Sequence, residues 1–210
     1  MKIGIIGAGN VGGALGKGWA KTGHEVMFGV RNTSDPEVNA LLKQAGANAR
    51  AGSVAEAAKF GEVVVFATPW PATQEAVRNA GNLSCKVVFD CTNPLKPDMS
   101  GLEVGHTTSA AEQVAGWAKG ARVAKIFNTT GSNNMENPRY PQGPATMFYC
   151  GDDASAKAAA AQLATDLGFE AIDAGGLSIA RLLEPYAMLW IHLALRQGIG
   201  REFAFKVIRR

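Results

Sequence analysis

The stretch IGIIGAGNVG, residues 3–12, decides the fold that we predict for this chain. It opens with a short apolar run, typical of a buried strand, and continues as G-x-G-x-x-G into a helix predicted over residues 10–21. Gly7 permits a tight turn, Gly9 lets the backbone approach a pyrophosphate, and Gly12 allows the helix to lie close to the strand. The amides at the start of the helix then face the phosphates. A dinucleotide-binding turn is favoured over a turn that only packs the helix, and its candidate residues are Gly7, Ala8, Gly9, Asn10, Val11 and Gly12.

Strand-like and helical segments alternate along the rest of the chain. Apolar runs predict further strands over residues 24–30, 62–68, 86–92, 122–128, 145–151 and 169–173. Helices are predicted over residues 35–43, 71–79, 109–118 and 154–167, whereas residues 133–144 are rich in Asn, Pro and Gly and are predicted to be a loop. This alternation indicates a parallel sheet, and runs such as VVVF suit strands that helices cover on both faces. We therefore predict an α/β fold with a doubly wound, mostly parallel Rossmann sheet.

The segment FGVRN, residues 28–32, ends the second predicted strand and indicates which dinucleotide is bound. A carboxylate near Val30 would accept hydrogen bonds from a ribose 2′-hydroxyl and repel a 2′-phosphate. This chain instead offers Arg31 and Asn32, followed by Thr33 and Ser34. A guanidinium binds phosphate through paired, charge-assisted hydrogen bonds, so NADP(H) is favoured over NAD. The alternative is that Arg31 is only a solvated surface residue.

Asp35 is the nearby carboxylate that argues against this assignment. It precedes Pro36 and Glu37, as expected of a residue that caps a helix whose first position is proline. We therefore predict that Asp35 caps the helix and does not bind the ribose.

Three more turns follow predicted strands, at residues 68–71, 92–95 and 128–132. Ligands of open α/β sheets lie over the carboxyl ends of the strands, so these turns are candidate binding sites. They carry neutral hydrogen-bonding groups and none of the His, Lys or Tyr side chains that commonly move a proton in a dehydrogenase. We predict no catalytic acid or base and no metal site, and structural roles for His24, His106 and His192. The candidate cofactor-binding residues of these turns are Thr68, Trp70, Asn93, Asn128, Thr129 and Ser132.

Composition limits the partners that we expect. The chain has 210 residues, 19% of them charged, and a net charge of +3 without a long block of one sign, which favours neither nucleic acid nor an anionic membrane. The first ten residues lack the apolar core of a signal peptide, and the apolar residues 186–195 are too few to span a bilayer. Cys85, Cys91 and Cys150 lack metal-ligand spacing, which indicates reduced thiols and a cytoplasmic protein.

The terminal segment, residues 177–195, is strongly apolar. It places Leu182, Tyr186, Leu189 and Leu193 on one helical stripe, and Pro185 is expected to kink or restart the helix. Packing on the chain's own sheet and pairing with a second copy both explain such a face, and we predict a homodimer. No domain boundary is visible, so residues 1–210 are expected to form a single Rossmann-type NADP-binding domain with residues 176–210 as a small C-terminal helical extension.

Several segments together resemble the F420-dependent NADP oxidoreductase family. They are GAGNVG at residues 7–12, GHEVMFGVRN at 23–32, ATPW at 67–70, VAKIFNTTG at 123–131, CGDD at 150–153 and IDAGGLSIARLLEP at 172–185. The resemblance covers nearly the whole chain, and its late segments are more specific than the glycine-rich turn. The FNT form at residues 127–129 is also similar to the oxidoreductase domain of the STEAP metalloreductases, which pair NADPH with a flavin.

The resemblance implies a Rossmann domain with a small C-terminal extension, usually dimeric, in which NADP(H) exchanges a hydride directly with the deazaflavin coenzyme F420. It places residues 8–11 at the pyrophosphate, Arg31 at the 2′-phosphate and the turn of residues 128–132 near the nicotinamide. It also places Trp70 and Gln74 beside the cofactor. No catalytic acid or base is implied by that chemistry.

Two departures from the family pattern bear on the choice of cofactor. The family often has Ser before the arginine, and this chain has Val30 there, which removes one phosphate donor. Asp35 also stands where the family can carry a basic residue. The preference for NADP is therefore expected to be weaker than Arg31 alone would give.

The leading hypothesis is an NADPH-dependent oxidoreductase that transfers a hydride between NADPH and F420 or a flavin such as FMN or FAD. A non-catalytic NADP(H)-binding sensor or interaction module is the alternative, because no titratable catalytic group is found. Reduction of an imine or a β-hydroxy acid would use the same phosphate turn. Families with that activity usually append a large helical domain with a catalytic lysine, and only a short segment follows CGDD here.

Overall fold

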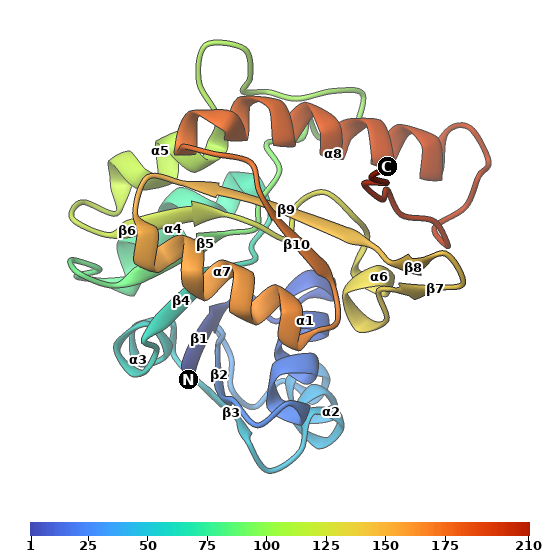
Figure 1. Cartoon of the computed structure of the whole chain (residues 1–210). Helices are drawn as coiled ribbons and strands as arrows, with labels where there is room; N and C mark the ends of the chain where they lie inside the picture. The colour runs from blue at the N-terminus through green and yellow to red at the C-terminus, as the bar shows by residue number, and fades with distance from the viewer.

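The computed structural model describes all of residues 1–210 and consists of a large sheet with helices packed on both faces (Figure 1). The strands of this sheet are β1 (Lys2–Ile6), β2 (Glu25–Gly29), β3 (Ala49–Gly52), β4 (Val63–Phe66), β5 (Val87–Asp90), β6 (Arg122–Lys125), β9 (Thr146–Gly151) and β10 (Glu170–Asp173). The helices are α1 (Asn10–Lys21), α2 (Pro36–Ala45), α3 (Val54–Phe60), α4 (Trp70–Ala80), α5 (Ala110–Trp117), α6 (Ser132–Glu136), α7 (Ala154–Asp166), the 3₁₀ turn η1 (Leu177–Ile179) and α8 (Ala180–Leu195).

The eight strands lie in the order β10-β9-β6-β5-β4-β1-β2-β3. All neighbouring pairs are parallel except β6 and β9, which run antiparallel. The doubly wound, mostly parallel sheet predicted from the sequence is therefore confirmed. The chain builds outward from β1 to β3 on one side and from β4 to β6 on the other, so the direction of winding changes between β1 and β4. Ligands of such sheets bind at this change of direction, beyond the carboxyl ends of the strands.

Alternate residues of the central strands face two separate cores. Along β4, Val63 and Val65 belong to one buried cluster, and Val64 and Phe66 belong to the other. Helices α1, α2, α6 and α7 contribute to the first cluster, while α3, α4, α5 and the start of α8 contribute to the second. Covering both faces explains why VVVF is apolar without alternation, as the sequence predicted.

Helix α1 is fixed by close contacts on the first face of the sheet. A Cβ atom on Gly16 would lie 2.3 Å from the Phe28 ring, so only glycine lets the helix approach β2 this closely. The buried Trp19 donates its indole N–H to the Leu163 carbonyl of α7 at 2.9 Å. These contacts hold the second half of α1 against β2 and α7.

Two regions differ from the sequence-based expectations. Residues 133–144 were expected to be a loop, but they contain most of α6 and the two-residue strands β7 (Arg139–Tyr140) and β8 (Gly143–Pro144). No strand or helix was predicted between residues 44 and 61, where the structure has β3 and α3. The segment ARAG of β3 is a short edge strand without an apolar alternation, whereas α3 begins with a capping box formed by Ser53 and Glu56.

The C-terminal extension is helical only to Leu195, so the expectation of a helical segment over residues 176–210 is wrong for residues 196–210. Helix α8 continues through Pro185 and does not restart there. Beyond α8 the chain turns back toward β9, where Thr146 donates its backbone N–H to the Phe205 carbonyl at 3.1 Å (Figure 1). Lys206 pairs with Glu170 of β10 at 3.0 Å. No helix in the molecule is both long and apolar enough to cross a membrane.

Candidate functional site

The glycine-rich turn between β1 and α1 has the geometry of a phosphate cradle. Gly7 has a φ of +105°, and a Cβ there would lie 2.7 Å from the Ala67 carbonyl oxygen. A Cβ on Gly12 would lie 1.9 Å from the Gly7 carbonyl oxygen, so glycine is required for the helix to start this close to the strand. Gly9 has open space at its Cβ position, which leaves room for a ligand against the backbone. Each glycine therefore has the local environment that its predicted task requires.

The amino end of α1 presents unpaired donors. Gly9 is its capping residue and supplies no side-chain hydrogen bond, and no acidic residue lies in the first turn. The first turn of a helix leaves backbone N–H groups without an intrahelical partner, and the helix dipole adds partial positive charge there. An anionic group fits this position because the amides of residues 10–12 point toward it.

The end of β2 lies beside this turn, since Gly7 donates its N–H to the Gly29 carbonyl at 3.2 Å. Arg31 is exposed and takes part in no hydrogen bond or ion pair. The Asn32 side chain accepts a hydrogen bond from the Ser34 N–H at 3.0 Å, which shapes the loop after Arg31. The Arg31 guanidinium is thus free to meet an anion near the phosphate turn.

Asp35 caps α2, as predicted. Its carboxylate accepts a hydrogen bond from the Glu37 N–H at 2.9 Å, and Pro36 occupies the first helical position. The carboxylate is therefore committed to the helix end.

The turn after β4 uses most of its polar groups internally. The Thr68 and Thr73 hydroxyls are hydrogen-bonded to each other at 3.0 Å. Trp70 is the first residue of α4, and its ring stacks on Trp117 with 5.5 Å between ring centroids. Gln74 lies one turn later on α4 and is exposed. Of the residues predicted here, Trp70 is partly committed to packing between α4 and α5.

The ends of β5 and β6 are joined by a pair of asparagines. Asn93 donates its side-chain amide to the Asn128 carbonyl at 2.9 Å, and Asn128 donates its side-chain amide to the Asn93 side-chain oxygen at 3.1 Å. Asn128 also donates to the Leu183 carbonyl of α8 at 3.1 Å. Two buried oxygens here have no hydrogen-bond partner, Asn128 Oδ1 and Thr92 Oγ1. A buried polar atom without a partner costs about 1–3 kcal/mol, so both are suited to contact a polar ligand.

The rest of the 128–132 turn is more dispersed. The Thr129 hydroxyl faces Met147 Sδ at 3.9 Å, inside the first core. Ser132 starts α6 and accepts a hydrogen bond from the Arg201 guanidinium at 3.5 Å. The structure therefore brings Asn93 and Asn128 together, whereas Thr129 points into the core and Ser132 lies under the C-terminal segment.

Sequence reasoning missed a buried charge cluster below the asparagine pair. Lys125 Nζ lies 2.8 Å from Asp90 Oδ2 and 2.9 Å from Glu184 Oε1, and it also donates to the Thr92 carbonyl. All three charged side chains are completely buried. Burial alone lowers the pKa of Lys125, but the charges of Asp90 and then Glu184 outweigh that effect and raise the pKa above its usual value.

Glu184 links this cluster to the amino end of α5. Its carboxylate accepts hydrogen bonds from the backbone N–H groups of Ala110 at 3.0 Å and Ala111 at 3.2 Å. The helix terminus therefore offsets part of the negative charge that the two carboxylates bring. The sequence carries one partial signal for this cluster, because Lys125 interrupts an apolar strand. Its position directly opposite Asp90 follows only from the register of β5 and β6 in the structure.

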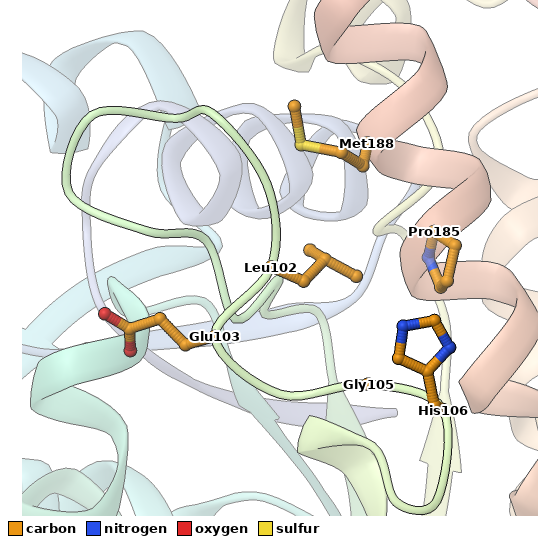
Figure 2. Close-up of a pocket in the computed structure, with 6 residues that line it drawn as sticks. All are labelled: Leu102, Glu103, Gly105, His106, Pro185 and Met188. Atoms are coloured by element: carbon orange, nitrogen blue, oxygen red, sulfur yellow. The ribbon is translucent and has the colours of Figure 1, made fainter.

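A cavity of about 360 Å³ opens where the loop after β5 meets α8. Figure 2 shows Leu102, Pro185 and His106 near one another, with Met188 on the next turn of α8 and the Glu103 carboxylate pointing away. His106 has a φ of +62°, an uncommon conformation for a residue with a side chain. The loop after β5 carries both Asn93 and the cavity residues Leu102 and His106, and α8 carries both Pro185 of the cavity and Leu183, whose carbonyl accepts from Asn128. The molecule contains no group of three or more His, Cys, Asp or Glu side chains arranged to hold a metal ion.

Comparison with known proteins places this arrangement among NADP-dependent oxidoreductases. Residues 2–94 match the sequence profile of the family described as "NADP oxidoreductase coenzyme F420-dependent". The F420-dependent NADP reductase of Methanothermobacter thermautotrophicus is 30% identical over 215 aligned residues, covering 95% of this chain and 91% of that protein. Metalloreductase STEAP3 of Rattus norvegicus is 28% identical over 87% of this chain, which corresponds to 36% of its own length.

Solved structures give the same result. A crystal structure from Arthrobacter sp. FB24, provisionally assigned as an F420-dependent NADP reductase, covers all of this chain with a TM-score of 0.90 and 32% identity. A reductive aminase from Aspergillus terreus, solved in complex with NADPH4, shares the fold with a TM-score of 0.67 and 22% identity. This chain spans 62% of the length of the reductive aminase.

Proposed function

This chain belongs to the coenzyme F420-dependent NADP oxidoreductase family, and from that premise we propose that it transfers a hydride between NADPH and the deazaflavin coenzyme F420. The observation that carries this proposal is the uncapped start of α1 beside an unpaired Arg31. A pyrophosphate and a 2′-phosphate are two anions on one molecule, and these two features are cationic or donor-rich sites on one edge of the sheet.

The dinucleotide would extend along the carboxyl ends of the strands. The backbone of residues 8–11 would hold the pyrophosphate, and Arg31, together with Asn32, would hold the 2′-phosphate. Thr68, Trp70 and Gln74 would flank the middle of the molecule. The nicotinamide would then lie over the turns at Asn93 and at residues 128–132, where the unpartnered Asn128 Oδ1 can accept a hydrogen bond from a carboxamide.

NADPH supplies the hydride when bound, so the chain needs to align two rings and exclude water. The cavity of about 360 Å³ between the loop after β5 and α8 has the size of a small-molecule site and would receive the acceptor ring. Apolar surface from Leu102, Pro185 and Met188 suits a flat aromatic ring. The sites proposed for donor and acceptor therefore share the loop after β5 as their common wall.

We also propose that residues 1–210 act as a single NADP-binding domain with residues 176–210 as its extension, and that the protein is a cytoplasmic homodimer. On α8, Leu182 and Leu189 are exposed, with 65% and 47% of their surface accessible. Their position on one face of the helix supports pairing with a second copy. A monomeric mass by light scattering at micromolar protein concentration would contradict the dimer.

The enzymatic proposal is tested by mixing the protein and NADPH with F420, and in parallel with FMN and FAD, while nicotinamide absorbance is followed. We expect rapid loss of the absorbance with F420. Oxidation only with FMN or FAD would replace F420 by a flavin as the partner. Measurable NADPH binding without oxidation by any of the three would instead favour a non-catalytic NADP(H)-binding module.

A further inference from the structure

A buried charge cluster links two strands and one helix. It consists of Lys125, Asp90 and Glu184. The cluster joins β5 through Asp90, β6 through Lys125, and α8 through Glu184, with ion-pair distances of 2.8 Å and 2.9 Å. All three side chains are completely buried, so the ion pairs are shielded from solvent and from salt. These contacts fix where α8 crosses the ends of the central strands.

The cluster and the asparagine pair are connected at two points. Lys125 donates to the Thr92 carbonyl, which is bonded directly to the backbone of Asn93. Glu184 follows Leu183, whose carbonyl accepts the side-chain amide of Asn128 at 3.1 Å. The contacts therefore form a closed hydrogen-bonded network. It runs from Lys125 through Thr92 to the asparagine pair, and returns through Leu183 and Glu184 to Lys125.

Stability alone does not explain a buried charge cluster of this kind. Removing charges from water is costly, and replacing a buried ion cluster by apolar side chains of similar volume is often neutral or stabilising. What charges provide, and apolar packing does not, is a fixed direction for each hydrogen bond. In this chain the fixed directions set the positions of Thr92, Leu183 and, through them, Asn128.

We propose that Lys125 is a positioning residue for the nicotinamide end of the bound dinucleotide and that it acts through Asn128. The proposal rests on the NADP(H) binding proposed above and does not depend on which molecule accepts the hydride. Lys125 is too deeply buried to touch the cofactor. Its contribution is to hold the Asn128 amide at the height and angle at which it meets the nicotinamide.

The test compares two ligands that differ at the nicotinamide end. NADPH carries the nicotinamide, whereas adenosine 2′,5′-bisphosphate carries only the adenosine and 2′-phosphate end. For Lys125→Met we expect the dissociation constant of NADPH to rise about tenfold and that of adenosine 2′,5′-bisphosphate to change by less than about twofold. Equal weakening of both ligands would indicate a merely structural role, and no change in either would also overturn the proposal.

Two further variants make the test decisive. Glu184→Gln removes one charge from the same network and is measured in the same way, which keeps the test available should Lys125→Met not fold. Lys86→Met is the matched control, because Lys86 donates to the Lys59 and Gly61 carbonyls at the opposite end of β5. We expect Lys86→Met to leave both dissociation constants unchanged.

A double-mutant cycle tests the route through Asn128. If Lys125 acts through Asn128, then Lys125→Met should raise the dissociation constant of NADPH by less than about twofold in an Asn128→Ala background. The same tenfold effect in both backgrounds would contradict that route. All of these experiments measure binding and not hydride transfer. If the wild-type protein binds NADPH but reduces no acceptor, the proposed function is wrong, whereas the role of Lys125 in NADPH binding can still be tested.

Discussion

The phosphate turn and the charge cluster both lie at the carboxyl ends of strands of the same sheet and are built in opposite ways. The phosphate turn consists of consecutive residues, 7–12, and offers backbone amides and open space at the surface. The charge cluster consists of three side chains from residues 90, 125 and 184, all without solvent exposure. The phosphate turn is open to an anion, whereas the two carboxylates of the cluster already have Lys125 and the amino end of α5 as their partners.

This difference teaches how substitutions should act in each region. A ligand held by backbone groups is lost when space or charge at the surface changes, with little effect on folding. Side chains in a closed, buried network affect folding first, because a broken ion pair leaves an uncompensated charge in the interior. The following changes are ordered by the size of the effect that we expect.

Lys125→Met should cause the largest loss of stability. It leaves the carboxylates of Asp90 and Glu184 buried without their cation, and breaking a buried pair typically costs about 3–5 kcal/mol. Urea unfolding of the variant and the wild type measures the difference in free energy. Lys86→Met, which removes a half-buried lysine at the other end of β5, should cost about 1 kcal/mol. Equal losses of unfolding free energy in the two variants would show that the buried ion pairs of the cluster contribute no more than the hydrogen bonds of Lys86.

Gly12→Ala and Gly9→Ala should separate packing from ligand binding within the phosphate turn. A methyl group on Gly12 would lie 1.9 Å from the Gly7 carbonyl, so α1 has to shift, at a cost of about 1–3 kcal/mol in stability. A methyl group on Gly9 meets no atom within 4 Å, so stability should fall by less than about 1 kcal/mol. We expect Gly9→Ala nevertheless to raise the dissociation constant of NADPH about tenfold, because the methyl group would fill the space proposed for the pyrophosphate. Unaltered NADPH binding by Gly9→Ala, measured by calorimetry, would place the phosphates elsewhere.

Arg31→Ala should affect binding and leave folding unchanged. The guanidinium is exposed and unpaired, so stability should stay within about 0.5 kcal/mol of the wild type. Loss of charge-assisted hydrogen bonds to the 2′-phosphate should raise the dissociation constant of NADPH by roughly tenfold to a hundredfold. NADH lacks the 2′-phosphate and serves as the control ligand, whose dissociation constant should not rise. An NADPH dissociation constant equal to that of the wild type would refute the role given to Arg31.

Asp35→Ala should show the smallest effect and the opposite pattern. Removing the side chain that accepts the Glu37 N–H should lower stability by about 1 kcal/mol, as for other helix caps. NADPH and NADH affinities should both remain at the wild-type level. A selective loss of NADH binding would instead show that Asp35 contacts the ribose.

Most of the fold could be predicted from the sequence because its signals are local. The turn IGIIGAGNVG, the Asp35 cap and the apolar run VVVF each carry their explanation within a few residues. The charge cluster could not be predicted in the same way, because it depends on the register of β5 and β6 and on the path of α8. The tail after Leu195 was misjudged because its apolar residues pack beside β9 without forming a helix.

Within the candidate site the same division holds. The residues of the phosphate turn were predicted from the glycine spacing between a strand and a helix, since the three glycines have separate and local requirements. Asn93 and Asn128 were predicted as candidates from their places after strands, but their mutual hydrogen bonds follow only from the parallel pairing of β5 and β6. His106 was assigned a structural role, and only the structure shows that it lines a cavity.

Direct hydride transfer from NADPH to F420 is the central claim, and isotope transfer tests it most directly. Wild-type protein is mixed with F420 and NADPH that carries deuterium at the transferable C4 position, and the reduced F420 is isolated and weighed by mass spectrometry. We predict that the deuterium is recovered on the deazaflavin ring and does not exchange with solvent. Deuterium that stays on the nicotinamide, despite saturating binding of NADPH, would contradict the account.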